Sequence, residues 1–406
     1  MSLEPYINRC QSDIQGFGEV CSSCRARWIM TGQRRGLLLG RPLPLEKDLS
    51  FINKFWPNAR FGVDRRRDHT HDVGILENLL AGCARDCLNS RTRRDELLAA
   101  VTAVVEAKQN TSDAVKALIS SSLDNHVRNI KKTGGQCLLG KDHNLLYVMA
   151  SLAVNQGLQN TSLVVRLLQA IHDCEGGLDR IVLPAVMGPK VTYLLCSWRP
   201  DCDTPQQARD YLEYFLCHAR DHRLLLPRKD TQGQHGRVLD NPLPTMQAAT
   251  PLYVAVQAGD EVAVQLLLQY GASPVLGGLL CPYTSAIRRL SSCARANISN
   301  KRRCNCPGAQ NCLCDIPIRY PDEGKAILRL LLRAMGSPVL PEGGKNPDII
   351  HPRLLKDGLL PESPPELRHW CRITIRRSLH DNWALPYGTN KLKLPKTLVN
   401  YLDLDY

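Results

Sequence analysis

The chain has 406 residues, a formal net charge of +13 and 17 cysteines, and its hydrophobic content of 43% is ordinary for a globular protein. This length predicts two or three domains. With only 5% aromatic residues, the core must be built from Leu, Val and Ala, which favours packed helices.

No apolar run approaches the ~18 residues that a membrane helix needs, and the first residues do not have the pattern of a signal peptide. We therefore expect a protein with no membrane partner, in the cytoplasm or also in the nucleus. A reducing compartment argues against a disulfide framework, and an odd number of cysteines cannot pair completely within one chain.

Residues 1–74 form a basic N-terminal region without clear periodicity, expected to be a flexible arm or a strap. The positive charge of the chain occurs in short runs such as Arg65–Arg67 and Lys301–Arg303, with few interleaved aromatic residues. No RNA-binding or zinc-finger signature accompanies them. We therefore expect a solvated or partner-facing surface, and nucleic acid is not an expected partner.

Residues 75–120 hold two or three helical stretches, including Glu96–Glu106, and the segment 75–140 is expected to be a helical cap or a diverged repeat. Two helix pairs are predicted further along the chain: 145–150 with 163–168, and 191–196 with 208–217. A generic helical bundle is the alternative interpretation of the residues before 180.

Residues 250–272 have the pattern of a helix, a tight turn and a second helix. Thr250 is placed to cap the first helix, and Pro251 suits its first turn. Gly259 suits the turn between the helices. The opening Thr-Pro-Leu-x-x-Ala resembles an ankyrin repeat. This implies flanking repeats, because a single repeat cannot bury both of its faces.

A degenerate copy of this opening begins at Pro282–Ala286, about one repeat length downstream. Its second helix is expected at Gly324–Arg333, so a cysteine-rich insert, residues 291–320, separates the two helices. We therefore expect degenerate ankyrin repeats over residues 141–340.

The insert holds two Cys-x-Cys pairs on either side of a Pro-Gly turn: Cys304, Cys306, Cys312 and Cys314. Four thiolates are a ligand set that suits a structural zinc ion, although the spacing within each pair is tighter than usual. The hypotheses are a zinc site at this insert or a disordered loop. No other cofactor is expected.

The C-terminal residues 360–406 begin with a helix whose start is signalled by a Ser363–Glu366 capping box and by Pro364 at the first helical position. Apolar residues then recur at every fourth position and form one narrow stripe: Leu367, Cys371, Ile375 and Leu379. Arg372 and Arg376 lie toward the C-terminal end, where the helix dipole favours cations.

The stripe resembles the Elongin-binding half of a SOCS box, whose pattern is Leu-x-x-x-Cys-x-x-x-(Ile/Leu/Val). Residues 392–402 resemble the cullin-selecting half of that box. The matching residues of this second segment are Leu394, Pro395, Leu398 and Tyr401. Lys393 stands where the pattern usually has its first proline.

Repeats followed by a terminal SOCS box are the layout of the ankyrin repeat and SOCS box family, and the chain resembles a divergent member. The resemblance implies an all-α fold: a helical N-terminal region, an ankyrin-repeat solenoid and a three-helix SOCS box. It implies a non-catalytic adaptor of a ubiquitin ligase. The stripe would bind Elongin C with Elongin B, the second segment would meet Cullin-5 with its RING protein, and the repeats would hold an unknown protein substrate.

Two other functions stay open: an ankyrin scaffold without a ligase role, and a regulator that binds zinc or nucleic acid. No phosphate loop, nucleophile elbow or metal-hydrolase helix is present, so an enzyme is not expected. The SOCS-box interpretation also predicts poor solubility of the isolated chain, because its apolar stripe would face solvent.

Overall fold

The computed structural model describes residues 83–228, 233–276, 280–300, 320–336, 353–360 and 365–405, together with Leu76 and Leu80. The chain divides into two compact units, Met1–Lys54 and Phe55–Tyr406, and every described residue belongs to the second. The basic region 1–74 therefore lies outside the described residues. So do the four cysteines of the predicted zinc site: Cys304, Cys306, Cys312 and Cys314.

The first long helices cover the predicted cap and the first predicted helix pair. They are α5 (Arg91–Glu106), α6 (Thr111–Lys132), α7 (Lys141–Asn155) and α8 (Thr161–Glu175), preceded by the 3-10 helix η1 (Cys87–Asn89). Helix α7 packs against α5, α6 and α8, so residues 143–150 are all buried. Asn110 and Asn160 cap α6 and α8 by accepting a hydrogen bond from the backbone N–H three residues on.

The predicted pairing of residues 191–196 with 208–217 is wrong. Helix α11 (Pro205–Asp221) packs instead on α9 (Asp179–Met187), a helix that was not predicted. Pro184 inside α9 and the following Gly188, whose φ is +82°, read as breaks in the sequence, yet α9 is buried along nearly its whole length. Helix α10 (Pro189–Cys196) packs on α9 at the edge of the stack and leaves most of its apolar side chains exposed.

This difference between α9 and α10 predicts opposite responses to the same substitution. Leu183 on α9 is 0% exposed, so we expect Leu183→Ala to lower the free energy of unfolding by about 2–5 kcal/mol. Leu194 on α10 is 71% exposed, and Leu194→Ala should change it by less than about 0.5 kcal/mol. Denaturant unfolding of the two variants checks this, and equal losses would contradict the assignment of α9 as the core helix.

A short antiparallel ribbon follows α11 within a structure that is otherwise mostly helical, consistent with the predicted all-α class. Strand β1 (Leu225–Pro227) pairs with β2 (His235–Arg237), with Leu226 opposite Gly236. Two short 3-10 helices, η2 (Val238–Asp240) and η3 (Pro244–Met246), lead on to the next helices. The rest of the described chain is mostly helical.

The helix pair predicted at residues 250–272 is present as α12 (Pro251–Ala258) and α13 (Glu261–Gln269). The Thr250 hydroxyl accepts a hydrogen bond from the Tyr253 N–H at 3.4 Å, and Gly259 ends α12 in the left-handed conformation with φ +74°. Asp260 then caps α13 through the Ala263 N–H at 2.9 Å. The turn therefore uses the residues that the sequence indicated.

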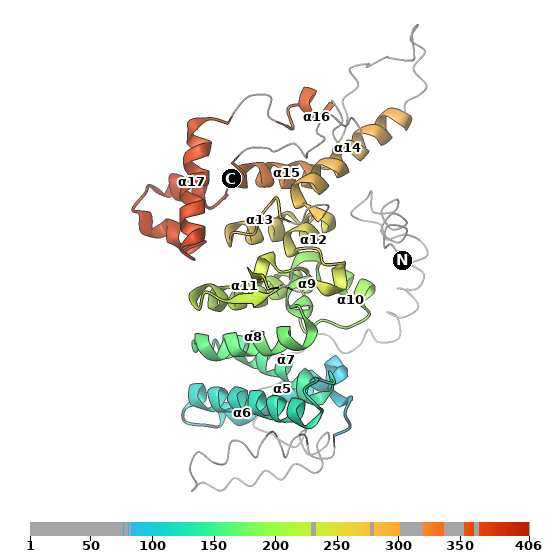
Figure 1. The fold of residues 1–406 in the computed structure, drawn as a ribbon, viewed down its shortest axis with the longest axis vertical. Coiled ribbons are helices and arrows are strands. Elements are labelled where there is room, and N and C mark those ends of the chain that lie inside the picture. The colour runs from blue at the N-terminus through green and yellow to red at the C-terminus, as the bar shows by residue number, and fades with distance from the viewer. Residues whose placement is uncertain are drawn as a thin grey trace. The chain divides into compact units, whose positions relative to one another are not determined.

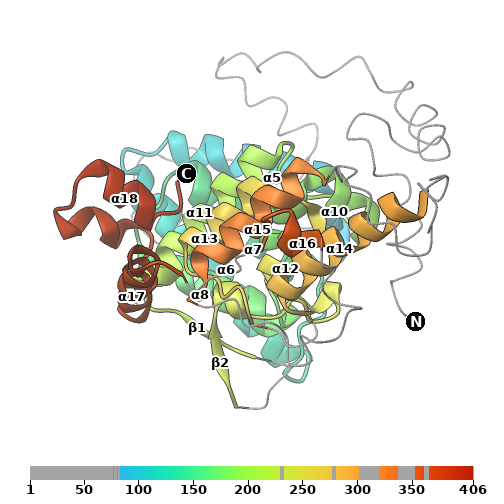
Figure 2. The ribbon, with the colours of Figure 1, turned by 90° about the horizontal axis from the view of Figure 1, so that it is seen from above.

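The next pair is α14 (Pro282–Asn300) and α15 (Asp322–Ala334), which pack on each other and on α12 and α13 respectively. The delayed second helix predicted after the insert is therefore present. One turn of helix, α16 (Arg353–Lys356), follows and contacts α14. Figure 1 shows the helices from α5 to α15 stacked broadly in chain order, and Figure 2 looks down this stack from above. None of the helices in the described ranges is long and apolar enough to cross a membrane.

Candidate functional site

The C-terminal module, residues 365–405, consists of α17 (Leu367–Asp381), the 3-10 helix η5 (Tyr387–Leu392) and α18 (Lys396–Leu402). Three helices were predicted; over these residues the structure has two α-helices and one 3-10 helix. The predicted capping box at the start of α17 is wrong, since Glu366 itself occupies the N-cap position and its side chain makes no cap hydrogen bond. Ser363 and Pro364, the other predicted signals for the helix start, lie outside the described residues.

Helix α17 buries charged residues and exposes apolar ones. Arg372 and Arg376 are its buried residues, whereas the Leu367 side chain is 79% exposed and Cys371 is exposed on the next turn. Within the described part of the chain, this leucine and cysteine on one face of α17 are left uncovered. This face is therefore a candidate partner-binding surface.

The four residues of the predicted stripe do not share one environment. A four-residue step advances about 40° around a helix, so Leu379 lies about 120° from Leu367. Leu379 accordingly points into the C-terminal module and packs closely on Gly388. A Cβ atom added at Gly388 would lie only 3.0 Å from the Cδ2 atom of Leu379. Ile375 is half-buried between these extremes. The exposed partner surface is thus the N-terminal half of the stripe.

Arg376 holds α17 against the neighbouring elements. It is 6% exposed, and its guanidinium donates hydrogen bonds to the main-chain oxygens of Leu402 on α18, at 2.7 Å, and of Leu268 on α13. Burial lowers the pKa of Arg376 to about 10, while Asp403 opposes this shift. The guanidinium therefore stays charged at neutral pH. The sequence suggested only a helix-dipole role, because nothing local indicates the distant carbonyl groups.

Arg372 and Tyr401 join the two α-helices of the module. The Arg372 guanidinium lies 4.3 Å from the centre of the Tyr401 ring, and that of Arg368 lies 4.1 Å from it. Arg372 also donates to His369 Nδ1 at 2.7 Å, and His369 Nε2–H donates to the Met335 oxygen after α15 at 2.6 Å. Tyr401, predicted to meet a cullin, thus has contacts within its own module.

The rest of the predicted cullin segment lies around the start of α18. Pro395 is its N-cap residue and is exposed, Leu398 on the first turn is 39% exposed, and Leu394 is half-buried. Lys393 has φ +51°, a left-handed conformation that proline cannot adopt because its ring fixes φ near −65°. At Lys393 the chain therefore lacks the proline of the family pattern and has a left-handed backbone conformation into which a proline does not fit.

Residues 363–403 match the SOCS box family. They form a SOCS box. SOCS boxes generally bind Elongin B, Elongin C and a cullin, and the proteins that carry them are typically non-catalytic adaptors of ubiquitin ligases. Neither a curated protein nor a solved structure matches the chain.

The SOCS box is joined to α13 by a row of amide hydrogen bonds. The side-chain amides of Gln265 and Gln269 both donate to the Asp405 carboxylate, at 2.9 and 2.8 Å. They also donate to the main-chain oxygens of Leu404 and Asp403, at 3.2 and 3.0 Å. These hydrogen bonds therefore attach the C-terminal end of the SOCS box to α13.

Tyrosines connect the SOCS box to α11 and α13. The hydroxyls of Tyr387 and Tyr270 both donate to the Glu213 carboxylate, at 3.1 and 3.0 Å, and lie 3.3 Å apart. Burial raises the pKa of Tyr387 to about 12, so it remains a neutral hydrogen-bond donor. Arg220 lies over the Tyr387 ring at 4.7 Å.

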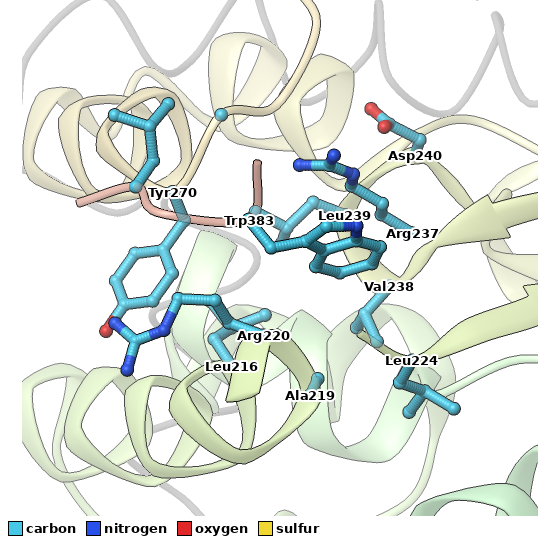
Figure 3. Close-up of a pocket in the computed structure, with 12 residues that line it drawn as sticks. Leu216, Ala219, Arg220, Leu224, Arg237, Val238, Leu239, Asp240, Tyr270 and Trp383 are labelled. Atoms are coloured by element: carbon cyan, nitrogen blue, oxygen red, sulfur yellow. The ribbon is translucent and has the colours of Figure 1, made fainter. Parts of the chain in front are cut away.

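A small cavity of about 30 Å³ remains where the SOCS box meets α11, the β-ribbon and the end of α13 (Figure 3). Arg237 donates to the His380 main-chain oxygen at 2.7 Å and stacks on the Trp383 ring at 4.0 Å beside it. The cavity has room for no more than a few water molecules. This junction is therefore a packed contact and not a ligand site.

Proposed function

We propose that this chain is the substrate-recognition adaptor of an Elongin B/C–Cullin-5 RING ubiquitin ligase. The SOCS box would recruit Elongin and the cullin, and the stacked helix pairs over residues 141–340, interpreted as degenerate ankyrin repeats, would hold a protein substrate. The chain would catalyse nothing. It would place a substrate lysine near a charged ubiquitin carrier and raise their effective concentration.

One observation carries the Elongin part of this proposal. Within the segment that matches the SOCS box, α17 buries Arg372 and Arg376 and presents Leu367 and Cys371 to solvent. A leucine that becomes buried at the centre of an interface contributes roughly 2–3 kcal/mol by its area. Leu367 is the proposed anchor in an apolar pocket of Elongin C, with Cys371 and Ile375 beside it. Leu379 supports the stripe from inside the box.

The interpretation of the helix pairs as ankyrin repeats has support from local structure and from stacking. Helices α12 and α13 have the cap, turn and spacing of the Thr-Pro-Leu-x-x-Ala pattern, and they pack on α14 and α15. Stacked helix pairs provide an extended surface on which a protein substrate can lie.

The choice of Cullin-5 depends on the segment around Pro395 and Leu398, which are both exposed and free of the contacts that hold Tyr401. We propose that these two residues form the centre of the cullin surface, with Leu394 supporting them from below. The test is a competition capture, in which Cullin-5 and Cullin-2 are offered together to the complex with Elongin B and Elongin C. Preference for Cullin-2 would overturn the choice of cullin and leave the adaptor function intact.

Restoring the family proline should harm this segment. Lys393→Pro is incompatible with φ +51°, so we expect it to destabilise the turn between η5 and α18 by about 3 kcal/mol and to weaken Cullin-5 capture. Lys393→Gly is the matched control and should be nearly neutral, because relief of left-handed strain offsets the added chain entropy. Thermal unfolding and cullin capture measure both variants. Improved capture by Lys393→Pro would show that the turn is different in the complex.

The experiment that tests the proposal is co-expression of the full chain with Elongin B and Elongin C, followed by capture on a tag carried by the chain. Stoichiometric recovery of both Elongins, with solubility that depends on them, is the expected result. If neither Elongin is recovered, the adaptor function is overturned and a scaffold without a ligase role takes its place.

A further inference from the structure

Four potential metal ligands meet between helices α6, α7 and α8, far from the SOCS box in sequence. This His2Cys2 cluster consists of His126, Cys137, His143 and Cys174, and one ligand atom of each lies within 4.8 Å of all the others. His126 belongs to α6, His143 to α7 and Cys174 to α8, whereas Cys137 belongs to the turn between α6 and α7. The cluster is distinct from the predicted cysteine site in the insert.

The cluster is interior. Both imidazoles are 2% exposed and both cysteines are half-buried. His126 Nε2 lies 3.2 Å from Cys174 Sγ. Zinc bonds of 2.0–2.3 Å in a tetrahedron place neighbouring ligand atoms about 3.3–3.8 Å apart, so these ligand atoms need only small shifts around one ion.

His143 has one nitrogen occupied and one nitrogen without a partner. Its Nε2 atom lies 2.7 Å from the Glu175 carboxylate, which therefore accepts a hydrogen bond from it. Its Nδ1 atom is buried and has no hydrogen-bond partner. A buried polar atom without a partner is costly. A metal-binding histidine usually donates its other N–H to a carboxylate, and this is the arrangement that His143 and Glu175 provide.

Cys137 is the inward-facing residue of an otherwise exposed turn. Residues 131–136, Leu138 and Leu139 are all exposed, and Cys137 alone of residues 131–139 is half-buried. The Leu139 N–H donates to Cys137 Sγ at 3.4 Å, a contact that stabilises a sulfur carrying negative charge. This turn has no apolar core of its own, so a bond from Cys137 would fasten it to the helices.

We propose that the His2Cys2 cluster binds one structural zinc ion through His126, Cys137, His143 Nδ1 and Cys174, with Glu175 orienting His143. Two thiolates and two imidazoles are a ligand set that zinc prefers, and four protein ligands leave no open position for catalysis. The ion would fasten α6, α7, α8 and the turn after α6 to one another. Its role is thus to stabilise the start of the helical stack, from α6 to α8.

Zinc content of the purified full-length chain, carried on a solubility-enhancing fusion, tests the proposal without Elongin. We expect the Cys137→Ser, Cys174→Ser variant to lose one zinc ion per chain, measured by plasma mass spectrometry. The matched control is Cys304→Ser, Cys306→Ser in the insert, which should keep that ion. The proposal is overturned if the first variant holds as much zinc as the wild type, or if the wild type holds none and takes up none. It is also overturned if a Cys137–Cys174 disulfide is found in protein whose free thiols were alkylated before purification.

A second variant keeps the test independent of misfolding. Glu175→Gln keeps a hydrogen-bond partner for His143 while removing the charge, and we expect zinc affinity to fall about 10–100-fold in a chelator competition. In a chain that already carries the Cys304→Ser, Cys306→Ser substitutions, bound cobalt should show the absorption of a tetrahedral site with two thiolates, and adding Glu175→Gln should raise the cobalt concentration needed to reach it. Unchanged affinity in Glu175→Gln, or a spectrum with four thiolates, would overturn the proposed ligand set.

Discussion

Replacing Leu367 and Cys371 with aspartate should abolish the capture of Elongin B and Elongin C. The substitution removes the proposed anchor, worth roughly 2–3 kcal/mol, and places two carboxylates where an apolar pocket would cover them. Together these effects should weaken binding by at least about 4 kcal/mol, or roughly a thousand-fold. Because both side chains are exposed in the free chain, its fold should not change. Capture from co-expressing cells and titration of the purified proteins measure the loss.

The matched control is Arg377→Ser with Lys391→Ser. Both residues are exposed in the SOCS box and lie outside the stripe, and the double substitution changes the net charge by the same amount as the aspartate pair. Capture should remain at the wild-type level. Equal capture by the aspartate variant and the control would show that Elongin does not use the face of α17 that carries Leu367.

Arg376→Met should loosen the SOCS box from α13 while leaving the earlier helices unchanged. The main-chain oxygens of Leu402 and Leu268 lose their charged donor, and each buried acceptor without a partner costs about 1–3 kcal/mol. Removing a buried charge recovers part of this cost. We expect a net loss of about 3 kcal/mol, so that the amides of α17 and α18 exchange with solvent roughly 100-fold faster. Hydrogen–deuterium exchange measures this helix by helix.

The neighbouring substitution Arg377→Met is the control, because Arg377 is exposed on the same turn of α17. Its effect should stay within about 0.5 kcal/mol. Exchange in α7 and α8 should be unchanged in both variants. If Arg376→Met leaves the protection of α17 and α18 intact, the contacts of Arg376 with Leu268 and Leu402 do not hold the SOCS box in place.

Features that depend on neighbours in sequence could be predicted. The helix pair α12 and α13 begins and turns where Thr250 and Gly259 indicated, because caps and left-handed turns are decided within a few residues. The SOCS box was found in the same way, from the four-residue repeat that starts at Leu367.

Features that depend on tertiary contacts were missed or misread. Helix α9 was not predicted; it contains Pro184, and packing against α11 and α12 keeps it helical. Arg376 was assigned only a helix-dipole role, because its carbonyl partner Leu268 lies in another helix. The His2Cys2 cluster draws its ligands from three helices and a turn, so no short spacing signals it. The available signal was the presence of His126 and His143 among the apolar residues of α6 and α7.

Gly271, at the end of α13, limits the modularity of this SOCS box. Its φ is +92°, and a Cβ there would lie 2.6 Å from the His380 ring and 3.3 Å from Leu385. Helix α13 and the residues that follow it thus supply part of the contact surface for the box, in addition to the Leu268 oxygen that binds Arg376. A graft of residues 363–406 onto an unrelated helical protein would carry a buried arginine without its acceptor. The portable unit for engineering a new ligase adaptor from this chain therefore begins at α12, with Thr250, and includes the last helix pairs together with the box.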